Sequence, residues 1–286
     1  MKTRSYLLAI DGSQASRSAA HFAWELAKQT DSQVVAQHVV DTTEIWRFLS
    51  YDLAGFIGSG LYMDARERIT EVMYSIAEAL MLSYGSQAEG QSLRFENYID
   101  EGEPTVEIAR RAVDHDLVIL GFHARRSNRR QKSLFEELAK ACPCPVLVVR
   151  DVVKRWSKMQ IFVSRDMLGS NTIDDICQMG EAFGLPLEIL LDTRDNELTE
   201  SDRARISLTH GASAFGVNTI RSANFKEVID STEDDVLLVV SADALNSAHD
   251  SLAKARIYKF LQASAGRALL LWRDRAKVVS SVRLAS

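Results

Sequence analysis

The stretch LLAIDGSQASRSAAHFAWELAKQ, residues 7–29, holds a strand, a turn and the start of a helix. Its opening apolar run predicts a short buried strand over 6–10. The Asp-Gly-Ser sequence at 11–13 is typical of a turn, because Asp and Ser side chains bond to nearby backbone N–H groups. Apolar side chains then recur at helical spacing and predict a helix over 14–28 with one buried face. That face holds Ala15, Ala19, Phe22, Ala23 and Leu26.

The same alternation of short apolar runs and amphipathic stretches continues through the first 150 residues. It indicates βαβ units and a parallel sheet. Further strands are predicted at 33–40, 93–99, 117–120 and 145–149, and further helices at 64–84, from Pro104 and at 133–142.

Two of these helices are predicted with defined buried faces. The long helix is expected to stop at Gly85, since glycine commonly follows the last helical turn. Its buried stripe is predicted to hold Ile69, Val72, Met73, Ile76 and Leu80. The helix that begins at Pro104 is expected to turn Val106, Ala109, Ala112 and Val113 inward.

The second half repeats the pattern with a weaker signal. Strands are predicted at 159–164, 187–191, 215–220, 236–240 and 268–272, and helices at 171–183, 199–213, 225–230 and 251–264. Each half closes with a strand followed by arginine, VLVVR at 146–150 and LLLWR at 269–273. The chain is therefore predicted to duplicate one five-stranded α/β unit. The expected domains are 1–150 and 151–275, joined through a linker at 151–158 and followed by a tail at 276–286.

Composition narrows the class of protein. The chain has 286 residues, a net charge of −5 and 46% hydrophobic residues, which suits a globular protein of about two domains. An acidic balance argues against a dedicated nucleic-acid binder. The apolar runs are too short for a membrane span or a signal peptide. Three cysteines make neither a disulfide framework nor a zinc set, so a cytoplasmic, reducing compartment is expected.

Several stretches of the first half, taken together, resemble the universal stress protein family. They are the strand, turn and helix of 7–29, QHVVD (37–41), Gly102-Glu103-Pro104 at the family's Gly-x-Pro turn, DLVILG (116–121) and ACPCPVLVVR (141–150). The resemblance covers nearly all of residues 1–150, and the second half resembles a diverged tandem copy. It implies an α/β fold of two doubly wound, five-stranded parallel-sheet repeats in tandem. That fold is Rossmann-type and adenine-nucleotide alpha-hydrolase-like, with strand order 3-2-1-4-5. The repeats would pair as an internal pseudo-dimer, and a further homodimer is left open.

In such a sheet, ligands bind beyond the carboxyl ends of the strands, where the strand order reverses. The expected crevice lies between Asp11, after the first strand, and Gly121, after the fourth. Asp11 is a candidate acceptor for an adenine amino group or a ribose hydroxyl, beside a local role in the turn. Val39 either lines the base slot with its backbone edge or is a buried strand residue, and Ala9 is the candidate from the first strand. His38 is interpreted as a packed residue at a strand end.

The loop GFHARRSNRRQKS, residues 121–133, decides whether phosphate can bind. Nucleotide-binding members of the family carry Gly, two residues, Gly, nine residues, Gly and then Ser or Thr, so that backbone N–H groups close round the phosphates. Gly121 and Ser133 match the ends of this pattern, and Leu134 after them is a further candidate binding residue. Ala124 and Lys132 replace the inner glycines, and the loop is two residues shorter.

Several outcomes stay open for this loop. Side chains at 124 and 132 block the backbone approach and nucleotide binding is lost, or charged donors such as Arg125 and Lys132 replace the backbone amides. Otherwise the loop binds a different anionic partner, or is solvated surface whose arginines pair with acids such as Glu136 and Glu137.

The remaining motifs add little chemistry. The segment 241–251, after the second half's fourth strand, contains no glycine, so a second phosphate cradle is not expected. The aromatic-rich segment 42–63 is either a loop covering the core, or a lid over the crevice or contact with the second repeat. No nucleophile–base pair or metal-ligand spacing is recognisable.

The resemblance therefore implies a non-catalytic stress-response protein with ATP or AMP as a candidate ligand of the first repeat. The alternative is a ligand-free pseudo-dimer that binds a regulatory protein, and a nucleotide-hydrolysing enzyme is the weaker third hypothesis.

Overall fold

A computed structural model describes residues 4–43, 59–122, 133–150, 156–164, 167, 172–192, 217–245, 251–263 and 267–273. The arginine-rich segment 123–132, most of the predicted 42–63 segment, the predicted helix 199–213 and the tail at 276–286 lie outside these ranges.

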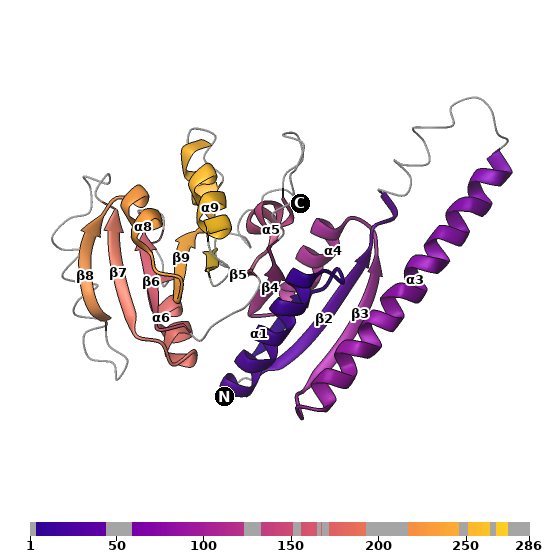
Figure 1. The fold of residues 1–286 in the computed structure, drawn as a ribbon, viewed down its shortest axis with the longest axis horizontal. Coiled ribbons are helices and arrows are strands. Elements are labelled where there is room, and N and C mark those ends of the chain that lie inside the picture. The colour runs from indigo at the N-terminus through magenta and orange to yellow at the C-terminus, as the bar shows by residue number, and fades with distance from the viewer. Residues whose placement is uncertain are drawn as a thin grey trace.

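The described strands form one ten-stranded sheet in the order β3-β2-β1-β4-β5-β10-β9-β6-β7-β8 (Figure 1). The strands of the first half are β1 (Ser5–Ala9), β2 (Gln33–Val40), β3 (Phe95–Glu101), β4 (Leu117–Gly121) and β5 (Val146–Val149). Those of the second half are β6 (Lys158–Val163), β7 (Leu187–Asp192), β8 (Val217–Ala223), β9 (Val236–Ser241) and β10 (Ala268–Trp272). Each half has the order 3-2-1-4-5, so the predicted fold of two doubly wound repeats is confirmed.

The two halves join through their last strands. β5 pairs antiparallel with β10, whereas neighbouring strands within each half are parallel. Because the junction is antiparallel, the two five-stranded units lie side by side in one sheet and are related by an approximate two-fold axis. The last helix of one repeat therefore lies next to the last helix of the other repeat.

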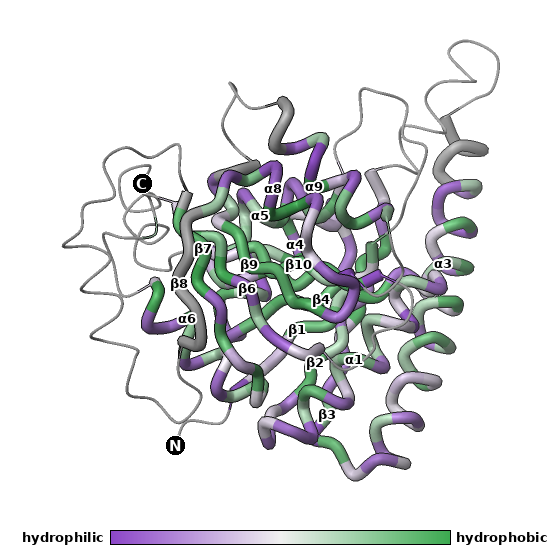
Figure 2. Tube along the Cα trace, turned by 60° about the vertical axis from the view of Figure 1, so that its left-hand side comes forward, coloured by the Kyte–Doolittle hydropathy of each residue, from purple (hydrophilic) through white to green (hydrophobic). Residues whose placement is uncertain are grey.

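Helices cover both faces of the sheet. One face packs against α1 (Gln14–Thr30), α3 (Ser59–Glu89) and α6 (Thr172–Ala182). The opposite face packs against α4 (Pro104–Arg111), α5 (Leu134–Ala141), α8 (Phe225–Ser231) and α9 (Ser251–Ala263). Short 3-10 turns η1 (Ala112–Asp114) and η3 (Ala242–Leu245) complete the second layer. Apolar residues follow the central strands in Figure 2, as expected for strands buried on both faces.

Arg150, which follows the closing strand of the first repeat, reaches the second repeat. Arg150 donates to the carbonyl oxygens of Leu261 and Gln262, at 3.1 and 2.5 Å, near the C-terminal end of α9. The arginine that follows the closing strand of the first repeat thus puts positive charge at the negative end of a helix in the second repeat.

The predicted stripe of the long helix is partly wrong. α3 continues through Gly85 to Glu89, and Ile69, Val72 and Ile76 are 36%, 58% and 62% exposed. Met73 and Leu80 are partly buried as predicted. The fully buried positions are instead Ala77, Met81, Tyr84 and Ala88, which share another face. That face packs against the sheet and keeps Gly85 helical, so tertiary contact overrides the local stop signal.

The predicted inner face of α4 is also partly wrong. Ile108 and Ala112 are buried, whereas Val106 and Val113 are 54% and 63% exposed. Ile108, the half-buried Ala109 and Ala112 share the side that packs on the sheet. Val106 is two residues from Ile108 and therefore lies on another side of the helix, whereas Val113 lies in the tighter turn η1.

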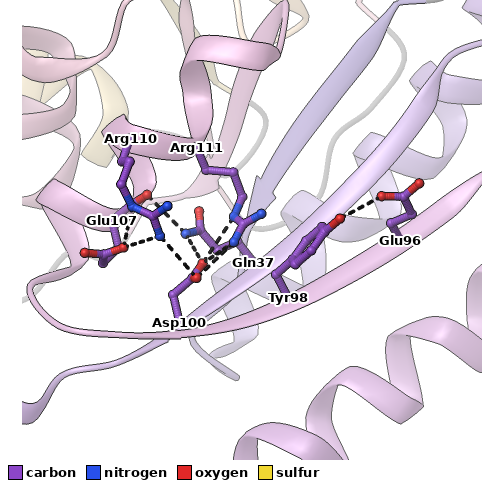
Figure 3. A network of polar contacts seen from close by, with 7 residues as sticks. All are labelled: Gln37, Glu96, Tyr98, Asp100, Glu107, Arg110 and Arg111. Atoms are coloured by element: carbon purple, nitrogen blue, oxygen red, sulfur yellow. Dashed lines mark hydrogen bonds and ion pairs between the residues drawn. The ribbon is translucent and has the colours of Figure 1, made fainter.

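A polar network fixes α4 on the sheet (Figure 3). Arg111 binds Asp100 of β3 through both carboxylate oxygens, at 2.8 to 3.1 Å, and its guanidinium lies 3.9 Å from the centre of the Tyr98 ring. Gln37 of β2 donates to Asp100 at 2.7 Å and to the Glu107 carbonyl oxygen at 3.2 Å. A bidentate ion pair with partly buried partners of this kind holds the helix in one orientation.

Within the described ranges, no helix is both long and apolar enough to cross a membrane.

Candidate functional site

The strand order marks the position in the first repeat at which a ligand crevice is expected. β1 has β2 on one side and β4 on the other, so the chain leaves β1 in one direction and later returns to its opposite side. A crevice forms at the carboxyl ends of two strands where the connections diverge in this way. Ala9 ends β1, Gly121 ends β4, and Val39 lies near the end of β2. These three candidate residues therefore come together at one edge of the sheet.

Asp11 has the local role expected of a turn residue. Its Oδ1 accepts a hydrogen bond of 3.0 Å from the Ser13 backbone N–H, and Gly12 has a φ of +77°. Ser13 caps α1 by accepting from the Ser16 backbone N–H at 3.0 Å. The Asp11 side chain is exposed, so this turn presents a carboxylate just beyond the carboxyl end of β1 while it organises the start of α1.

The end of β2 contributes a backbone edge. The Ile10 N–H donates to the Gln37 carbonyl oxygen at 2.9 Å, so Gln37 turns its backbone polar groups toward β1. Alternate residues of a strand share an edge, and Val39 therefore turns its N–H and C=O the same way, beyond the last residue of β1. Its side chain is half-buried against the core, and Ala9 beside it is buried. His38 Nδ1 bonds to the Ile10 carbonyl oxygen at 2.8 Å, which matches its interpretation as a packed strand-end residue.

Gly121 is required by packing of the first helix. A Cβ atom on it would lie 2.3 Å from the carbonyl carbon of Ala15, 2.4 Å from its oxygen and 2.7 Å from the Ser16 nitrogen. No real Cβ contact is so short, so the first turn of α1 sits directly against the end of β4. Gly121 was predicted as the first glycine of a phosphate loop. The packing of α1 also requires glycine at this position, whether or not a ligand binds.

Ser133 and Leu134 open the helix that follows the loop. Ser133 occupies the N-cap of α5, and among the described residues its side chain makes no capping hydrogen bond. Its Oγ instead accepts from the Tyr258 hydroxyl of α9, at 2.5 Å. Leu134 begins α5 and packs half-buried against the core. Arg125 and Lys132, the two basic candidates, lie outside the described residues.

Glu136 and Glu137, the acids weighed as partners for the loop arginines, have contacts elsewhere. Glu136 is 3% exposed and pairs with Lys254 of α9. Glu137 accepts from the Thr105 hydroxyl at 3.0 Å. The contacts to α9 were missed from sequence. The antiparallel pairing of the last strands brings α9 beside α5, and the duplication by itself does not fix how the two repeats pair.

Other reactive side chains do not gather in the crevice. The three cysteines are buried, and burial raises the pKa of the Cys177 thiol to about 12. Burial likewise lowers the pKa of His115, whose Nδ1 bonds to the Ser5 hydroxyl at the opposite end of β1. Over the ranges that the structure covers, no group of three or more His, Cys, Asp or Glu side chains could hold a metal ion.

Comparison with known proteins identifies relatives of both the repeat and the whole chain. The model of the universal stress protein family matches residues 3–150. A curated Staphylococcus saprophyticus protein named as a universal stress protein is 26% identical over 153 residues, which are 51% of this chain and 83% of that protein.

Solved structures match the fold. A universal stress protein from Archaeoglobus fulgidus superposes with a TM-score of 0.67 at 14% identity, covering 96% of this chain and 99% of its own. An Arabidopsis thaliana universal stress protein solved with AMP bound covers 51% of this chain and 89% of its own, at 14% identity. The TM-score of this superposition is 0.33.

Proposed function

We propose a function that starts from one fact: this chain belongs to the universal stress protein family. The proposed function is that of a non-catalytic, cytoplasmic stress-response protein, regulated by an adenine nucleotide, ATP or AMP, bound in the crevice of the first repeat. The second repeat serves as a structural partner domain.

The main support for this proposal is that four candidate groups lie at the carboxyl ends of neighbouring strands of the first repeat. The Asp11 carboxylate, the Val39 backbone edge, the end of β4 at Gly121 and the N-cap hydroxyl of Ser133 come from four separate segments. Each has the chemistry that one part of a nucleotide needs. The backbone edge suits an adenine ring, the carboxylate suits ribose hydroxyls, and a helix N-terminus with a hydroxyl suits phosphate.

The basic loop supplies the remaining part of the proposed site. Glu136 and Glu137 in the first turn of α5 would repel a phosphate at this helix N-terminus. Arg125 and Lys132 in the connecting loop offset that repulsion and replace the missing loop glycines with charged donors. Binding then changes the surface presented to a regulatory partner.

Co-purification and thermal shift test the proposal directly. Acid extraction of the purified protein should release adenine nucleotide, or millimolar ATP should raise the melting temperature of nucleotide-free protein. The Asp11→Asn variant keeps an oxygen to accept the Ser13 N–H but loses the charge, so it should bind more weakly. Asp230→Asn, an exposed change in the second repeat, is the matched control. Absence of both nucleotide and thermal shift would refute the proposal.

An ATP turnover assay on the same purified proteins distinguishes the enzyme hypothesis from the non-catalytic function. Turnover of ATP by the wild type that Asp11→Asn abolishes and Asp230→Asn preserves would contradict the non-catalytic function.

Gly121 favours a second candidate function. Packing of α1 explains this glycine without any ligand, and the loop after it departs from the family's glycine pattern. A ligand-free pseudo-dimer that binds a regulatory protein therefore remains the alternative, and it predicts no nucleotide in either assay.

A further inference from the structure

The second repeat reaches the start of α5 through one face of α9. Tyr258 and Lys254 are four residues apart in this helix and therefore lie on the same side of it. Tyr258 donates to Ser133 Oγ at 2.5 Å, and Lys254 pairs with Glu136 one turn into α5. Two residues of the second repeat thus contact the two polar side chains that begin the helix after the first repeat's loop.

The Tyr258 ring is held firmly in this position. Its centroid lies 5.2 Å from that of Phe135 and 6.2 Å from that of Phe122, the residue that follows β4. Phe122 and Phe135 also contact each other, at 5.9 Å. The three rings form a cluster between the end of β4, the start of α5 and α9, so the hydroxyl has little freedom to leave Ser133.

The direction of the hydrogen bond decides what Ser133 can do. A serine hydroxyl carries one hydrogen and accepts through its oxygen. Because the Tyr258 hydroxyl donates to that oxygen, Ser133 keeps its own hydrogen for another acceptor. A hydroxyl that accepts one hydrogen bond donates a stronger second one, since the two bonds polarise each other.

The surroundings keep Tyr258 a donor. Burial, and then a side-chain hydrogen bond with Glu136, raise the pKa of Tyr258 above its usual range. The contact with Ser133 opposes part of that rise, and the phenol stays protonated at neutral pH. Lys254 in turn neutralises Glu136, whose negative charge would otherwise oppose an anion near Ser133.

We propose that the second repeat completes the phosphate site of the first. Tyr258 is a positioning residue that fixes the Ser133 hydroxyl with its hydrogen available to a ligand phosphate, and Lys254 removes the opposing charge of Glu136. This inference rests on the proposed nucleotide site and deepens it, because it makes the site depend on the pairing of the two repeats.

The Tyr258→Phe variant tests the inference with AMP and adenosine as probes. The variant keeps the aromatic ring and removes only the hydroxyl. A hydrogen bond contributes about 0.5–1.5 kcal/mol, so we expect AMP to bind roughly 2- to 12-fold more weakly in calorimetric titration. Adenosine, which has no phosphate, should bind as it does to the wild type. Ser133→Ala should weaken AMP similarly, and adding Tyr258→Phe to it should have no further effect.

Tyr6→Phe is the matched control. It removes another buried phenol hydroxyl, which bonds to Thr30 at 2.9 Å near the start of β1, at the opposite edge of the sheet. It should leave the affinities for both AMP and adenosine unchanged.

Three results would overturn the inference, and they separate it from the proposed function. Unchanged AMP affinity in Tyr258→Phe, or equal loss of AMP and adenosine, would overturn the positioning role while leaving nucleotide binding in place. Failure of the wild type to bind either probe would overturn both proposals.

Discussion

Replacing Gly121 with alanine tests how closely the first helix packs on β4. The new Cβ would lie 2.3 to 2.7 Å from backbone atoms of Ala15 and Ser16, which cannot rotate away as a side chain could. Restoring an ordinary contact requires α1 to move by roughly 1 Å. Overpacking in a rigid core typically costs 1–3 kcal/mol, and backbone contacts place this change near the upper end, at about 3 kcal/mol. That loss corresponds to a fall in melting temperature of roughly 6–12 °C for a protein unit of 150–250 residues.

Gly85→Ala is the matched control for this prediction. Its Cβ would lie 3.6 Å from the Phe95 ring, an ordinary contact, and the residue is inside α3. Alanine in a helix interior should stabilise the protein by about 0.5–1 kcal/mol. The same substitution should therefore have opposite signs at the two glycines, as measured by urea unfolding of nucleotide-free protein. A Gly121→Ala variant within about 0.5 kcal/mol of the wild type would refute the close packing of α1 on β4.

Three further outcomes follow from burial. Met81→Ala, on the buried face of α3, should destabilise the protein by about 2–5 kcal/mol. Ile76→Ala, on the exposed face, should change the free energy of unfolding by less than about 0.5 kcal/mol. Comparable losses for the two variants would contradict the observed orientation of the helix. Burial raises the pKa of Cys177 to about 12, so Cys177 and Cys142 should react slowly with a thiol reagent at pH 8 and fully after denaturation; rapid native-state labelling would contradict their burial. Burial lowers the pKa of His115 in the folded state, so protonation favours the unfolded chain and stability should fall as the pH drops below about 6.5. His115→Gln should reduce this dependence of the free energy of unfolding on pH. An unchanged pH dependence would show that His115 is not the group responsible.

Much of the fold could be predicted from local pattern. The strands at 33–40 and 268–272 agree with β2 and β10 to the residue, and α1 buries all five predicted apolar positions. The Asp11 turn and the Ser13 cap form as their side-chain chemistry indicates. These features depend on residues close in sequence, and the period of the apolar residues carries the information.

Prediction failed where several faces of a helix carry apolar residues. α3 has one such face at Ile69, Val72 and Ile76 and another at Ala77, Met81 and Tyr84, and periodicity alone favours the larger side chains of the first. Only the position of the helix against β3 selects the second. The candidate site shows the same limit. Asp11 and Ser133 could be picked out from the sequence, but the residues that contact them, such as Tyr258, could not.

The sequence by itself therefore determined the order of the elements, the duplication and the family. The strand order of each repeat was implied by the family resemblance, and the structure has the same order. Only the tertiary structure shows which face of α3 is buried, which backbone atoms leave no room for a side chain at residue 121, and which residue contacts Ser133. These outcomes depend on contacts between segments far apart in the chain, above all the antiparallel pairing of β5 with β10. That pairing brings Tyr258 of one repeat to the phosphate end of the crevice proposed in the other.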